Sequence, residues 1–311
     1  MPRVTPTHST CLTDELSAHM RTTECSGTGI SSILTAVRSL VRGLRLFLSA
    51  RPKTPLRVLC IMAFDMLHMR RHATPLPMRK LRTLAALLDF GACANAAFDG
   101  KDCCQHECRV TLQLLEDAGL RSSVVEYLQR LQDLECGRPL PGGDNWQFQK
   151  VSLYREDVVR LSLAMVAKAA NGNQCLDEEI RATYRDADLN ILFRIVMQCQ
   201  IIDDVLDYSA DAFAGLPSFL TAAPSLGQSF ELTRLAALGY ADDRGLLRTG
   251  DVVCLRLALC FVSTCTKLAI AVARWRQHNA LATAVHGTHR WTMRQAIYLT
   301  EQVPEAFIRR R

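Results

Sequence analysis

Aromatic residues are scarce in this chain of 311 residues, where they make up 6% of the sequence. Proteins that bind nucleic acids commonly present a basic stripe interleaved with aromatic side chains. The net charge is +6, but the basic residues are scattered, and their densest runs are residues 69–72 and 309–311. The sequence therefore argues against a nucleic-acid partner, although a mild positive charge suits an anionic ligand.

Several familiar patterns are also missing. The chain has no alternating apolar and polar run long enough for a strand, no internal repeat, no glycine-rich phosphate loop and no nucleophile elbow. The first thirty residues are polar and rich in Ser and Thr, without the apolar segment of a secretory signal. We therefore expect a cytoplasmic protein whose 13 cysteines are reduced thiols.

One group of potential metal ligands lies close together in the sequence, namely Cys103, Cys104, His106 and Cys108. Structural zinc sites usually draw their ligands from two separated pairs. Zinc is therefore the lesser interpretation, and we expect most of the cysteines to be small core residues.

The most apolar stretch covers residues 252–273 and is long enough to cross a bilayer. Arg256 and Lys267 interrupt it, and a charge at the centre of a spanning helix costs about 3 kcal/mol. We expect a buried helix of a large helical domain instead. Peripheral contact with a membrane surface stays open.

Apolar residues recur at helical spacing along most of the chain beyond residue 30. The pattern predicts an all-α fold with a flexible segment at residues 1–30 and one helical domain at residues 31–311. The expected helices cover residues 33–48, 56–72, 78–98, 105–118, 121–136, 151–170, 176–208, 229–238, 250–278 and 290–303.

Four carboxylates end the predicted helix 176–208 or follow it closely: Asp203, Asp204, Asp207 and Asp211. Spacings of three and four residues place side chains on neighbouring turns of one helix face. Like charges so placed repel by about 0.2–0.5 kcal/mol per pair, so folding gains nothing from them. Magnesium prefers oxygen ligands and is often held by one or two carboxylates together with substrate phosphates. The pattern indicates a magnesium site, and the alternative is a solvated acidic helix end.

Residues 200–207, Gln-Ile-Ile-Asp-Asp-Val-Leu-Asp, resemble the second aspartate-rich motif of polyprenyl diphosphate synthases. The longer pattern, with Asp207, Asp211 and Gly215 at intervals of four and residues 219–220 after them, is similar to the second motif of squalene and phytoene synthases. Both groups belong to the all-α isoprenoid synthases, which include the class I terpene cyclases. The resemblance covers about twenty residues. It implies a helical bundle of the isoprenoid synthase type.

The same resemblance implies a reaction. A prenyl diphosphate would be ionised with the help of Mg²⁺, followed by terpene cyclisation or prenyl condensation, with release of pyrophosphate. The catalytic and metal-binding residues would be Asp203, Asp204 and Asp207, with Asp211 as a further ligand.

A second acidic helix that faces the first is also implied. The candidates are Asn95, Asp99 and Asp102, which share a face if their helix continues past Gly100. They do not form the Asp-Asp-x-x-Asp first motif of chain-elongating synthases, and a helix end capped by Gly-Lys is an equal alternative. The Gly-Gly-Lys-Arg stretch of those synthases is missing too, which favours cyclisation or head-to-head condensation. The scarcity of aromatics argues against a large cyclase cavity.

Cationic and polar side chains are expected to contact the diphosphate. The candidates are Arg155, Arg160, Arg194 and Gln200. A homodimer stays open. Two other functions remain: a non-catalytic or degenerate helical binding protein, and an integral membrane prenyltransferase, against which the lack of repeated charge-free apolar spans argues.

Overall fold

The computed structural model describes residues 34, 35, 37–42, 45, 55–98, 105–140, 145–172, 175–241 and 253–286. Within these ranges all regular secondary structure is helical and no strand occurs, which confirms the all-α prediction. The predicted helix 290–303 and the segment 1–30 lie outside them, so the expected domain boundaries stay predictions. The described residues between 34 and 45 are helical, as expected.

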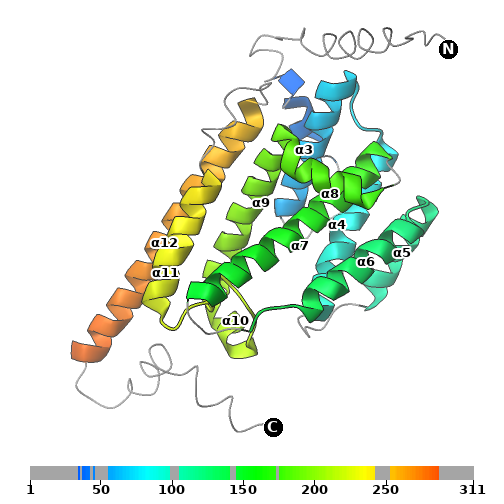
Figure 1. The fold of residues 1–311 in the computed structure, drawn as a ribbon. Helices are drawn as coiled ribbons and strands as arrows, with labels where there is room; N and C mark the ends of the chain where they lie inside the picture. Colours follow the sequence, from blue (N-terminus) through cyan, green and yellow to red (C-terminus); the bar gives the residue numbers. More distant parts are fainter. Residues whose placement is uncertain are drawn as a thin grey trace, which may run out of the picture.

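Ten helices are bounded in the part of the chain from residue 55 onward, and Figure 1 shows their arrangement. They are α3 (Pro55–His72), α4 (Met78–Phe98), α5 (Gln105–Asp117), α6 (Arg121–Cys136), α7 (Asn145–Asn171), α8 (Leu176–Arg185), α9 (Ala187–Leu206), α10 (Tyr208–Ala214), α11 (Leu226–Ala241) and α12 (Val253–His286).

The predicted helix 176–208 is divided among α8, α9 and the start of α10. At the first break, the Asp186 carboxylate accepts hydrogen bonds from the N–H groups of Asp188 (3.0 Å) and Leu189 (3.1 Å), which caps α9. At the second break, Asp207 leaves the helical conformation with φ −96° and ψ 8°. The prediction of one continuous helix is wrong at both positions, where a short carboxylate stands at a helix end.

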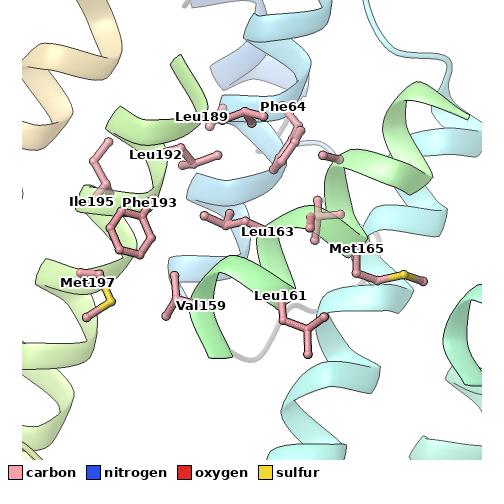
Figure 2. Close-up of a cluster of buried hydrophobic side chains, with 14 of the residues drawn as sticks. Phe64, Val159, Leu161, Leu163, Met165, Leu189, Leu192, Phe193, Ile195 and Met197 are labelled. Carbon is pink, nitrogen blue, oxygen red and sulfur yellow. The ribbon is translucent and has the colours of Figure 1, made fainter. Parts of the chain in front are cut away.

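Helix α9 forms the centre of the core. Leu192, Ile195, Met197 and Ile201 have no measurable exposure, because α3, α7, α8, α11 and α12 pack around this helix. Figure 2 shows part of this core, with side chains from α3, α7 and α9. A helix surrounded in this way is apolar on most of its circumference, and this explains the long apolar run that precedes the aspartates.

Two polar contacts show which helix ends lie together. Arg70 in the last turn of α3 pairs with Asp188 in the first turn of α9 at 3.2 Å. Lys80 in the first turn of α4 donates to the carbonyl of Ala170 in the last turn of α7 at 2.5 Å. Since α3 and α4 are joined by a short connection, these two contacts bring four helix ends together at one end of the bundle. The C-terminal ends of α4 and α9 and the N-terminal end of α7 therefore lie at the opposite end, where α10 follows α9 (Figure 1).

Gln198 connects α9 to the two helices that cover its other side. Its side-chain Nε2 donates to the carbonyl of Ala237 in α11 at 2.7 Å, and its own carbonyl accepts from Thr266 Oγ1 in α12 at 3.3 Å. The Leu255–His278 part of α12 is long and apolar enough to cross a membrane, yet only 33% of its most apolar window is buried. The sequence predicted a buried helix here, and only one side of α12 is buried.

The central position of α9 predicts a large cost for Leu192→Ala. Loss of a fully buried leucine side chain leaves a cavity, and we expect about 2–5 kcal/mol less free energy of unfolding. Leu140→Ala is the matched control, because Leu140 is 79% exposed. Urea titration monitored by circular dichroism measures both variants. Equal losses in the two would contradict the placement of α9 at the core.

Candidate functional site

The chain reverses direction just after α10. Gly215 adopts a left-handed conformation, with φ 67° and ψ 32°, and its N–H donates to the carbonyl of Asp211. The N–H of Leu216 donates to the same carbonyl at 2.9 Å. A side chain at a left-handed position costs about 1–2 kcal/mol, so glycine suits this place. The interval of four residues from Asp211 to Gly215 therefore corresponds to the last turn of α10 and its C-cap. After this cap the chain turns back toward α9.

A buried ion pair holds the returning segment, residues 216–222, which we name the return turn. Asp204 is 3% exposed, and its Oδ1 accepts from Nη2 of Arg155 in α7 at 3.1 Å. Its Oδ2 accepts from the N–H of Phe219 at 2.8 Å. Arg155 also donates to the carbonyl of Pro217 at 3.0 Å and to Gln200 Oε1 at 3.4 Å. One aspartate and one arginine thus join α9, α7 and the return turn.

Backbone groups of the return turn form hydrogen bonds within the protein, although the turn is largely buried. The N–H of Ser218 donates to Thr221 Oγ1 at 2.8 Å, and Thr221 N–H donates back to the Ser218 carbonyl at 3.1 Å. Thr233 Oγ1 in α11 donates to the carbonyl of Phe219 at 3.2 Å. The Phe219 ring is fully buried and lies 5.8 Å, centroid to centroid, from the ring of Phe148. Buried backbone groups need such partners, so this turn has a defined shape.

Burial raises the pKa of Asp204 to about 6. Arg155 and the Phe219 N–H lower the pKa of this carboxyl, whereas Asp211 and Asp203 raise it further. The cost of removing the charge from water is therefore larger than the gain from its partners, which is common for buried ion pairs. At neutral pH the carboxylate is mainly ionised and remains paired with Arg155.

The four predicted carboxylates lie in different environments. Asp203 and Asp207 are exposed, whereas Asp204 and Asp211 are buried. The N–H of Asp207 donates to the carbonyl of Asp203 at 2.8 Å, so these two residues lie one turn apart at the end of α9. The prediction that all four share one face is wrong, because adjacent residues of a helix differ by about 100° in direction and the helix itself ends at Leu206.

The upstream candidates lie only partly within the described residues. Asn95 is exposed in the last turn of α4, at the same end of the bundle as Asp203. Asp99 and Asp102 fall outside the described residues, as do Cys103 and Cys104. His106 is exposed on α5 and Cys108 is half-buried there. In the part of the chain that the structure describes, no three His, Cys, Asp or Glu side chains group closely enough to hold a metal.

Arg160 is engaged by the protein itself. Its Nη1 donates to the carbonyl of Thr183 at 2.9 Å. Its guanidinium lies over the rings of Phe193 and Tyr184, 3.6 Å and 3.8 Å from their centroids. Burial lowers the pKa of Arg160, while the nearby Tyr184, Glu156, Asp157 and Tyr240 raise it. Arg160 of α7 therefore contacts α8 and α9. The sequence predicted instead that it would contact a diphosphate.

Arg194 lies on the side of α9 opposite to Asp203. Nine residues correspond to about two and a half turns, and the half turn reverses the direction of the side chain. The Nη1 atom of Arg194 is buried and has no hydrogen-bond partner among the described residues. Of the predicted substrate-binding residues, the structure therefore brings Arg155 and Gln200 to the aspartates and keeps Arg160 and Arg194 away from them.

Two backbone groups of this site, the Pro217 carbonyl and the Phe219 N–H, form hydrogen bonds with Arg155 and Asp204. Residue types do not reveal such backbone partners. Gly215 and Pro217 mark a break in the chain, but residue types alone do not identify the residues onto which the following segment folds. No family model, curated protein or solved structure matches this chain. The functional interpretation therefore depends on the residues and their geometry.

Replacement of Arg155 by methionine should destabilise the fold strongly. The variant leaves the Asp204 carboxylate buried without its cation, which costs about 3–5 kcal/mol in comparable pairs. The double variant Arg155→Met with Asp204→Asn should recover part of this loss, because no buried charge remains. Arg130→Met removes an exposed pair with Asp177 and should change stability little. Chemical denaturation measures the cycle, and additive single losses would contradict the direct coupling.

The raised pKa of Asp204 predicts an unusual dependence of stability on pH. The ordinary pKa of an aspartate is 3.8, so between pH 4 and 6 the folded chain holds a proton that the unfolded chain releases. This contribution to stability is complete below the unfolded pKa and disappears as the pH rises through about 6. Compared with Asp204→Asn, the wild type should therefore gain melting temperature between pH 7 and pH 4. Parallel melting curves across this range would rule out the shift.

Proposed function

We propose that this chain is a magnesium-dependent isoprenoid synthase that ionises an allylic prenyl diphosphate and releases pyrophosphate. The observation that carries the proposal is the pair of exposed carboxylates, Asp203 and Asp207, one turn apart at an end of the bundle that also gathers Asn95. Folding gains nothing from exposed like charges so close together. A divalent cation bound together with a diphosphate would offset the repulsion between these two carboxylates.

Magnesium fits these donors. It demands hard oxygen ligands and retains waters, and proteins commonly hold it through one or two carboxylates plus phosphate oxygens of the substrate. Asp203 and Asp207 would supply such carboxylates, and Asn95 with Asp99 and Asp102 would face them in the proposed arrangement. When bound, Mg²⁺ would stabilise the charge of the leaving pyrophosphate.

The residues of this site have different roles in the proposed reaction. Asp203 and Asp207 hold the ion, whereas Asp204 positions them by fixing the end of α9 to α7 and to the return turn. Arg155 keeps 18% of its side chain exposed next to Gln200, so these two residues can contact the diphosphate from α7 and α9. The apolar core between α7 and α9 lies behind them and excludes water. Cyclisation and condensation both begin with this ionisation.

A second function is favoured by the engagement of Asp204 and Arg160 in contacts within the protein. A degenerate family member or a helical binding protein would keep these contacts and would lack turnover. Its exposed carboxylates would then contact a partner instead of a metal ion. The two functions differ in whether pyrophosphate is released.

Turnover of geranyl, farnesyl and geranylgeranyl diphosphates, with and without Mg²⁺, tests the proposal. We expect pyrophosphate release that requires Mg²⁺ and falls by about 100-fold or more in Asp203→Ala and in Asp207→Ala. Asp133→Ala, an exposed aspartate of α6, is the matched control and should retain full activity. The organic-phase product distinguishes a cyclase from a condensing enzyme. Absence of release from all three substrates would favour the binding protein.

A further inference from the structure

The outer side of α12 carries an apolar row opposite to its buried side. The buried side packs on the bundle through residues such as Leu255, Leu259 and Ile270. The exposed side chains follow one another at intervals of seven, four or three residues, which keeps them on one face of a helix. This row consists of residues that are 37–70% exposed, and we name it the outer row: Leu257, Phe261, Leu268, Val272 and Trp275.

The neighbouring helix α11 extends this surface. Arg274 of α12 pairs with Glu231 of α11, which places the outer sides of the two helices next to each other. Leu235 and Leu238 lie one and two turns beyond Glu231 on the same side of α11 and are 54% and 40% exposed. Figure 1 shows α11 and α12 together along one edge of the molecule. These leucines extend the exposed apolar surface beyond the Arg274–Glu231 pair, and exposed apolar surfaces of this kind mark interaction sites.

Most of the charges beside the outer row are basic. The sequence of α12 contains no aspartate or glutamate. At about 100° per residue, Arg256, Lys267 and Arg274 lie along one flank of the outer row, and Arg276 lies along the other. The acidic Glu231 is already paired with Arg234 and Arg274. An occupant of this surface must therefore be apolar at its centre and anionic at its rim.

We infer that the outer row docks on the surface of an anionic lipid bilayer, with α12 lying parallel to the membrane plane. Helices at such interfaces bury leucine, phenylalanine and tryptophan among the acyl chains and place lysine and arginine against anionic headgroups. A second copy of this chain would bring basic flanks together. A spanning helix would need lipid on all sides, whereas α12 packs on α9 and α11. The inference does not depend on the proposed catalytic activity.

Flotation of the full chain with vesicles tests this inference. We expect binding to vesicles of phosphatidylcholine with phosphatidylserine, much weaker binding to phosphatidylcholine alone, and release by high salt. Leu268→Glu should weaken binding about ten-fold, because it removes a leucine that the acyl chains would bury. Lys267→Glu should weaken binding to the anionic vesicles by about ten-fold as well, because it reverses a charge at the rim.

Two control variants test whether vesicle binding depends on this surface and not on other exposed residues. Leu114→Glu changes a leucine of α5 that is 52% exposed, and Lys150→Glu changes an exposed lysine of α7; both should bind as the wild type does. Melting temperatures confirm that each variant folds. Equal loss in the control variants, or no binding by the wild type, would overturn the inference. A dimer seen by light scattering, absent in Leu268→Glu and without vesicle binding, would overturn it in favour of a second copy of the chain.

Discussion

The buried ion pair between Asp204 and Arg155 is the constraint on which this end of the molecule depends. It joins the end of α9, the first half of α7 and the return turn through four hydrogen bonds that use both carboxylate oxygens and both terminal nitrogens of the guanidinium. The pKa of Asp204 shows that its burial is costly, since partners do not offset the loss of water. Such a pair gives defined geometry more than it gives stability, and here it fixes where the adjacent Asp203 and Asp207 emerge.

The aspartate-rich segment therefore contains two kinds of carboxylate. Asp204 and Asp211 face the protein, where one is an ion-pair partner and the other precedes the C-cap of α10. Asp203 and Asp207 are exposed to solvent. The charge of Asp204 is offset by its partners, whereas the two outer carboxylates are exposed to solvent, where a cation could reach them.

The sequence predicted the all-α class and the position of several helices. Periodicity located α3 to α6 within one or two residues, because each helix has one apolar side and a Gly, Pro or polar break at its ends. It missed the breaks at Asp186 and Asp207, although an aspartate before Ala187 is a helix-capping signal. Spacing identified the acidic segment but not its division into inner and outer residues. That division depends on Arg155, Pro217 and Phe219, which are distant in sequence and two of which act through their backbone groups.

The central claim is that Asp203 and Asp207 bind magnesium together with a diphosphate, whereas Asp204 holds the site in shape. Thermal melting in the presence of Mg²⁺ and inorganic pyrophosphate tests it most directly, since a ligand that binds only the folded state raises the melting temperature. We predict a rise that needs both components and that disappears in Asp203→Asn and in Asp207→Asn, with each variant compared with its own melting temperature without ligand. An unchanged melting temperature in the wild type, or a rise that both variants retain, would contradict it.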